Sequence, residues 1–162
     1  MSVKRDEIWL QELLDTAWDT YFEDVPQVND VRIIFGRRAK RRLGSISLDA
    51  KDRTVSIITV NGLFRLEEVP EYVILATLIH ELTHYAHGFN SPLEQAQAHP
   101  HAGGVMRREF GERGALALYQ EQKKWLKANW PTLLAREFPL KTRSGSARQT
   151  ALPKPFWFIG RD

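Results

Sequence analysis

The sequence predicts an α+β fold, and three observations lead to that prediction. An amphipathic segment near the start is followed by three short runs rich in β-branched residues, and then by a long apolar segment that leads into further helical sequence. With 162 residues, 43% of them hydrophobic, the chain is long enough for one domain with its own core. We expect residues 1–140 to form that domain: an N-terminal amphipathic helix, a small, mostly antiparallel sheet of three strands, a buried helix and a following long helix.

The first helix is predicted from Asp6 to about Val25. Asp6 and Glu7 lie in its first turn, where the helix dipole favours negative charge. Apolar residues then recur at steps of three and four, which is the spacing of one helical face. They are Leu10, Leu13, Leu14, Ala17, Trp18, Tyr21 and Phe22.

Three strands are predicted next, at Val31–Phe35, Leu43–Leu48 and Arg53–Val60. Turn residues at Asp49–Asp52 separate the second run from the third, and Asn61-Gly62 is a strong turn signal after it. Because all the connections are short, we expect neighbouring strands to pair mostly in the antiparallel direction.

The stretch from Val73 to Gly88 is predicted to be a buried helix that carries His80, Glu81 and His84. Histidines four residues apart lie one turn above each other on a helical face, so they can bind one metal ion. Glu81 would face the water that the metal activates rather than the metal. This is the H-E-x-x-H arrangement of zinc metallopeptidases, with two ligands and a general base on one rigid turn.

The surroundings of this motif support the metal interpretation. Pro70 and Glu71 suit the start of a helix, and Gly88 suits the position just after its end. The simpler alternative is a buried helix whose histidines are only hydrogen-bonded. Burying two histidines and a glutamate in an apolar helix is costly without a partner, and a metal ion removes that cost.

Beyond the motif the chain is predicted to be helical from about Gly104 to Lys127. Gly111 and Gly114 weaken this helix in the middle, so a break or kink is expected there. Pro131 is expected to end it, and Thr132–Phe138 to form a last short helix.

A catalytic zinc ion takes three protein ligands and keeps one open position. We predict His101 as the third ligand, because it ends the expected loop 89–100 and precedes a helix that can fold back over the motif. Other residues remain open as alternatives on geometric grounds. They are His99, two residues away; Glu109, a carboxylate from the next helix; and Glu94 and His87.

Composition excludes several classes of site. The chain has no cysteine, which excludes disulfides, a cysteine-ligated zinc ribbon and a thiol nucleophile. The start, MSVKRDEIW, is charged at once, and no apolar run approaches the roughly 18 residues that a membrane span needs. From this we expect a soluble cytoplasmic protein that does not act at a membrane.

A basic run lies between the first two predicted strands. Five of its six residues are cationic: Arg37, Arg38, Lys40, Arg41 and Arg42. Such a run is usually a solvated hairpin loop, and the alternative is contact with phosphates, which makes these residues candidate nucleic-acid contacts. The net charge of only +3 does not by itself indicate a nucleic-acid partner.

The last segment, residues 141–162, changes character. KTRSGSARQT is polar and basic, whereas PKPFWFIG is strongly apolar and extended by its prolines. An exposed aromatic patch of this kind should dock on something. We expect it to pack on the surface of the domain, or alternatively to lie in the substrate cleft as an added strand.

The order of these segments resembles the SprT-like zinc metallopeptidases, a family of HExxH zincins. The resemblance covers about Asp6 to Lys127 and includes VPEYVILATLIHELTHYAHG and, after a loop, HAGGVM. In that family the third zinc ligand is a histidine in an H-G-x-x-aromatic motif, which HAGGV from His101 matches with alanine for glycine and valine for the aromatic residue. The resemblance implies a minimal zincin-like domain that binds Zn²⁺ and cleaves proteins.

The family also includes proteases that degrade DNA-bound proteins, and many members carry a C-terminal zinc ribbon. A chain without cysteine cannot form that ribbon, so a DNA connection depends on the basic run and on Lys141, Arg143 and Arg148. We expect a zinc metallopeptidase with Glu81 as general base and a protein or peptide substrate. The alternative is a non-catalytic, metal-containing module that contacts protein or nucleic acid through the basic hairpin and the C-terminal tail.

Overall fold

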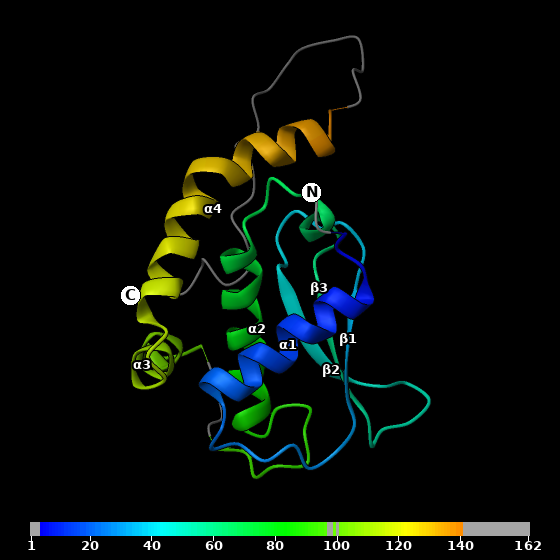
Figure 1. The fold of residues 1–162 in the computed structure, drawn as a ribbon, viewed down its shortest axis with the longest axis vertical. Helices are drawn as coiled ribbons and strands as arrows, with labels where there is room; N and C mark the ends of the chain where they lie inside the picture. Colours follow the sequence, from blue (N-terminus) through cyan, green and yellow to red (C-terminus); the bar gives the residue numbers. More distant parts are fainter. Residues whose placement is uncertain (1–3, 97–98, 100, 141–162) are drawn as a thin grey trace.

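The computed structural model describes residues 4–96, 99 and 101–140 of the chain (Figure 1). It confirms the α+β prediction, with one small sheet preceded by one helix and followed by three others. The elements, in chain order, are α1 (Glu7–Tyr21), β1 (Val31–Phe35), β2 (Gly44–Leu48), β3 (Ser56–Val60), the 3₁₀ helix η1 (Gly62–Arg65), α2 (Glu71–Ala86), α3 (Val105–Glu112) and α4 (Leu116–Glu137).

The sheet is mixed rather than mostly antiparallel, and this corrects the prediction. Its strand order is β1-β3-β2, with β1 parallel and β2 antiparallel to β3. Only the turn between β2 and β3 is a hairpin, closed by Asp49 N–H donating to the carbonyl of Val55 at 2.9 Å. The basic segment 36–43 is therefore not a hairpin loop. It crosses from β1 to the far edge of the sheet and leaves β2 as an edge strand.

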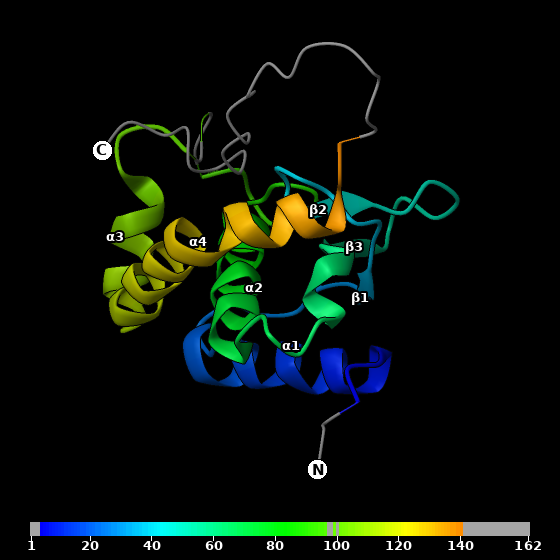
Figure 2. The same cartoon turned by 90° about the horizontal axis from the view of Figure 1, so that it is seen from above.

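One face of the sheet is buried beneath helices α1 and α2. Alternate residues of all three strands point to this face and are buried: Val31, Ile33, Ile46, Ile58 and Val60. The neighbouring side chain of Ile34 points the other way and is 43% exposed. Helix α1 packs against both β1 and α2, and Figure 2 shows it lying beneath both. The period-two burial of the strands thus fixes which way the sheet faces.

Helix α2 runs through the middle of the domain, with α1, the sheet, α3 and α4 packed around it (Figure 1). Every residue from Ala76 to Tyr85 is buried. The helix starts after Pro70, and Gly88 follows its end with φ of +79°, a left-handed conformation that glycine adopts without strain. Both predicted boundary signals are therefore confirmed.

The C-terminal helices confirm one prediction and contradict another. Gly114, with φ of +72°, separates α3 from α4, as the two glycines predicted. Pro131 does not end α4, which continues to Glu137 and changes direction in its second half (Figure 1). The reason is tertiary packing, because Trp130 and Leu134 are buried and outweigh the one backbone hydrogen bond that proline removes.

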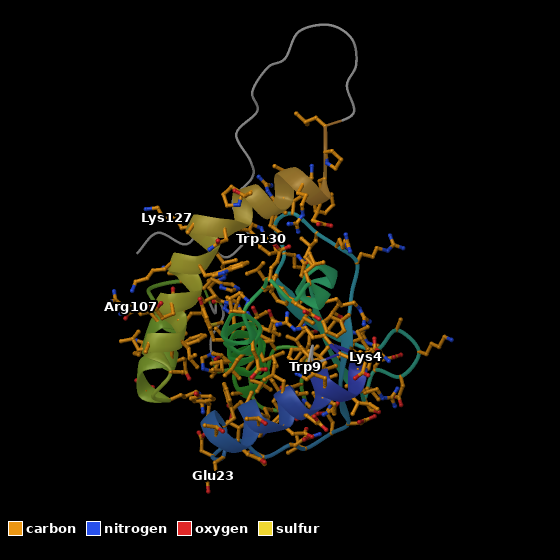
Figure 3. All side chains as sticks on the ribbon, turned by 45° about the horizontal axis from the view of Figure 1, so that its top comes forward. Lys4, Trp9, Glu23, Arg107, Lys127 and Trp130 are labelled. Atoms are coloured by element: carbon orange, nitrogen blue, oxygen red, sulfur yellow. The ribbon has the colours of Figure 1, made fainter. Side chains whose placement is uncertain are left out.

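Trp130 also fixes the basic crossover segment. Its indole Nε1 donates a hydrogen bond to the carbonyl of Lys40 at 3.1 Å. Figure 3 shows Trp130 between α4 and the rest of the domain, whereas Arg107 and Lys127 extend from the outer side. Helix α4 and the segment that leads into β2 are thus joined directly.

None of the helices in the described ranges is long and apolar enough to cross a membrane. The expected C-terminal tail, residues 141–162, lies outside the described residues, and so do both predictions about where it docks.

Candidate metal centre

Three histidines from two segments meet at one point. His80 and His84 lie one turn apart on α2, and their Nε2 atoms are 3.2 Å from each other. His101, from the segment between α2 and α3, brings its ring centroid to 5.1 Å from that of His80 and 4.8 Å from that of His84. The candidate ligand atoms of all three lie within 4.8 Å of one another. The described residues thus contain a group that can hold a metal ion.

The spacing of the imidazoles fits a tetrahedral ion. Two nitrogens bound to zinc at about 2.0–2.1 Å, with a tetrahedral angle between them, lie about 3.3 Å apart. A simple N–H···N hydrogen bond between His80 and His84 would give a similar distance. Such a bond would not require the third ring, so the approach of His101 favours the metal interpretation.

Burial keeps these rings neutral and able to bind metal. Desolvation, followed by repulsion from the other two histidines, lowers the pKa of His80 well below its usual value. Desolvation and the neighbouring histidines also lower the pKa of His84 to about 4, and desolvation lowers the pKa of His101. At neutral pH each ring therefore keeps a lone pair for a cation.

Glu81 is buried next to this group, with only 3% of its surface exposed. Desolvation raises the pKa of its carboxyl to about 8, and the positive charge of Arg42 acts in the opposite direction. The carboxyl group lines the same cleft as the three histidines. It is thus placed to exchange protons there.

Gly44, at the start of β2, is a site residue that our sequence reasoning missed. A Cβ atom at this position would lie 2.8 Å from Oε1 of Glu81 and 2.7 Å from Cγ2 of Thr77. Only glycine lets the strand approach α2 this closely. The sequence held one signal for it: Gly44 lies inside the predicted strand Leu43–Leu48, and a glycine within a strand often marks a close backbone approach.

The histidines and Glu81 share a cleft of about 430 Å³ with β2. Asn61 N–H donates to the Leu43 carbonyl and Asp49 N–H to the Val55 carbonyl, so the odd-numbered residues of β2 face β3. The backbone groups of Gly44 and Ile46 consequently point away from β3. The cleft is lined by Arg42, Gly44, Ser45, Ile46, Ser47, His80, Glu81, His84, Phe89, Asn90 and His101.

The other candidate ligands lie elsewhere. His99 and Glu94 are exposed, and neither belongs to the group of histidines. Glu109 instead accepts from Nε2 of His87 at 2.8 Å and pairs with Arg113 at 3.2 Å. Of the five candidates for the third ligand, His101 is the one that joins the group with His80 and His84, and its role as a ligand remains a prediction.

The five basic residues of the crossover segment are all exposed, but they are placed differently. Arg42 lines the cleft of the metal centre. Arg38 forms an ion pair with Glu137, and Nζ of Lys40 lies 5.3 Å from the centroid of the Phe138 ring. The candidate nucleic-acid contacts are therefore not equivalent.

The chain matches no protein-family model, no curated protein and no solved structure. A functional assignment must therefore come from the site. Among the residues described, the group has three candidate ligands, and three ligands leave a tetrahedral position open. An open position is what distinguishes a catalytic zinc site from a structural one.

Proposed function

We propose that this protein is a zinc-dependent metallopeptidase, similar in its site to the SprT-like family. The observation that carries the proposal is the convergence of three neutral imidazoles with a buried carboxyl group in one cleft beside an edge strand. The residues that would hold zinc are His80, His84 and His101. Zinc bound there supplies an acidic water and an electrophile for the peptide carbonyl.

Glu81 is the proposed general base. It takes a proton from the attacking water and passes it to the leaving amine as the peptide bond breaks. Its carboxyl has a pKa of about 8 in the metal-free protein because it is desolvated. A cation among the neighbouring histidines stabilises the carboxylate and lowers this pKa, so that the base is ionised when it is needed.

The edge strand β2 offers a way to hold the substrate. An extended peptide can pair with the backbone groups of Gly44 and Ile46 that face away from β3. The Ile46 carbonyl already accepts a hydrogen bond from Nδ2 of Asn90 at 3.0 Å, so pairing uses the remaining groups. A peptide in this position would pass through the cleft that contains Glu81 and the histidines.

The deciding experiment compares three variants of the zinc-loaded full chain on unstructured protein substrates. Glu81→Gln should keep zinc and lose hydrolysis, whereas His84→Ala should lose zinc as well. Glu12→Gln, on an exposed position of α1, is the matched control and should behave like the original protein. A Glu81→Gln protein that cleaves at the original rate would remove Glu81 from the mechanism.

A second candidate is a non-catalytic, metal-containing module that binds nucleic acid through the crossover segment. It is favoured by the exposure of all five basic residues there. Under this alternative a fourth protein ligand closes the metal site. DNA binding that falls steeply with added salt, without proteolysis of any substrate, would support it.

A further inference from the structure

Arg42 lies where two hollows meet. The first is the cleft of the metal centre, and the second is a smaller hollow of about 180 Å³ beneath the crossover segment. Arg42, Gly44 and Ser45 line both of them. The smaller hollow therefore opens beside the N-terminal end of the edge strand on which a substrate peptide is proposed to lie.

The segment that carries Arg42 is held in one conformation by hydrogen bonds. Nδ2 of Asn61, which is almost completely buried, donates to the carbonyls of Ala39 and Arg42, both at 2.7 Å. The Lys40 carbonyl accepts from Trp130, and the Arg37 carbonyl accepts from the N–H of Gly62 at 3.2 Å. Four carbonyls in six residues are thus bound to the body of the protein, and the basic side chains are exposed.

Two of the five basic side chains of this segment already have a partner within the protein. Arg38 has Glu137 as its partner, and Lys40 lies over the Phe138 ring. Arg37, Arg41 and Arg42 form no ion pair with any residue in the described part of the chain. Of these three, only Arg37 and Arg42 line the smaller hollow. The smaller hollow is thus lined by two arginines that have no ion-pair partner in the described part of the chain.

The size of the hollow limits what can enter. Ligand pockets for small molecules usually measure about 300–1,000 Å³, so a hollow of about 180 Å³ suits a single side chain. Ala39, which is partly exposed, contributes apolar surface for an aliphatic stem, and the two arginines can bind a carboxylate at its end. A nucleic-acid strand would instead require a row of cations along an open surface.

We propose that Arg42 and Arg37 form a specificity subsite for an acidic side chain, aspartate or glutamate, of a peptide lying along β2. This inference rests on the proposed peptidase function. It identifies the substrates as extended peptides with an acidic residue at one fixed distance from the bond that is cleaved.

The test uses the zinc-loaded full chain and a series of neutral peptides in which one glutamate is moved along the sequence. Each peptide is compared with versions that carry glutamine or lysine at the same position. Binding is measured by fluorescence anisotropy on the Glu81→Gln variant, and kcat/KM on the original protein. Because the arginines are exposed, we expect glutamate to be preferred by about threefold to tenfold at one position, and less at high salt.

Three arginine variants locate the effect. Arg42→Ala should abolish the preference, measured as the ratio of kcat/KM on the glutamate peptide to kcat/KM on the glutamine peptide, and Arg42→Glu should reverse this ratio in favour of the lysine peptide. Arg41→Ala is the matched control, because Arg41 lies in the same segment, is exposed and lines neither hollow. It should keep the full preference.

Equal binding of the glutamate, glutamine and lysine peptides at every position would overturn the subsite. If Arg41→Ala and Arg42→Ala lost the preference for glutamate equally, and a single-stranded oligonucleotide displaced the peptides, the subsite would be overturned in favour of a nucleic-acid surface. Cleavage without any acidic preference would reject the subsite and keep the peptidase. Acidic preference in binding without any cleavage would reject the peptidase and keep the subsite.

Discussion

Burial shifts the pKa values of the ionisable residues at the candidate metal centre, and the direction differs between the histidines and Glu81. Burial disfavours charge, so it lowers the pKa of His80 and His84 and raises that of Glu81. In the absence of metal, neutral forms of all three are therefore favoured near pH 7. A divalent cation needs no proton to leave the imidazoles, and its charge then favours the ionised form of Glu81.

The raised pKa of Glu81 predicts how stability depends on pH. A folded-state pKa of about 8, above the usual 4.5, means that the contribution of Glu81 is present below pH 4.5 and is lost as pH rises toward 8. Metal-free Glu81→Gln should therefore gain unfolding free energy relative to the original protein between pH 5 and pH 8, on the order of a few kcal/mol. The lowered histidine pKa values destabilise both proteins toward acid pH and cancel in the difference.

Denaturant unfolding in the presence of a chelator, at pH 5 and pH 8, measures this difference. A gap between the two proteins that is the same at both pH values would contradict the raised pKa.

Gly44 gives a second prediction at the scale of one residue. Gly44→Ala places a methyl group against Glu81 and Thr77, so it should destabilise the fold by about 1–3 kcal/mol and reduce peptidase activity. Gly111→Ala is the matched control, since a Cβ atom there meets nothing within 4 Å and the residue lies in α3. The control should be neutral or slightly stabilising. Thermal unfolding of both variants is the measurement, and equal effects would contradict the close-approach argument.

At the scale of elements, the metal centre joins a rigid helix to the segment that follows it. Helix α2 supplies two candidate ligands whose positions are fixed by burial, and His101 comes from outside any helix. His101→Ala should weaken zinc binding by more than about a hundredfold, because even an outer-shell partner is worth roughly 10- to 100-fold. Competition with a chromophoric chelator measures the affinity.

Two variants serve as controls for this prediction. His99→Ala and Glu109→Ala should both keep zinc affinity, since His99 is exposed and Glu109 is paired with His87 and Arg113. If either variant lost zinc and His101→Ala kept it, the assignment of the third ligand would be wrong.

The elements also show what the sequence could predict. Helix α2 and strand β1 follow from local periodicity and end signals, and β1 has the predicted bounds. The strand order of the sheet does not follow from local sequence, because a crossover connection and a hairpin loop of similar length carry the same sequence signals. The prediction that Pro131 ends a helix was wrong because α4 is held together there by the burial of Trp130, which depends on residues distant in the sequence. Gly44 was missed for the same reason, since the approach of β2 to α2 is a tertiary contact.

At the scale of the whole molecule, the site combines parts that are far apart in the sequence. The cleft takes one wall from β2, Glu81 and two histidines from α2, and its third histidine from the segment before α3. The motif predicted His80, Glu81 and His84 because all three lie on one turn. The choice between His101, His99 and Glu109 depended on the path of a loop, which no local pattern determines.

The hydrogen bond from Trp130 to Lys40 joins residues 90 positions apart. Through it the second half of α4 holds residues 37–42, which lead into the cleft, although α4 itself lines neither hollow. Under the proposed function, loss of this hydrogen bond should weaken discrimination among peptides before it displaces the three histidines, because Lys40 lies in the segment that carries Arg42. The residues proposed to select a substrate and those proposed to act on it would then be held in place by different parts of the fold.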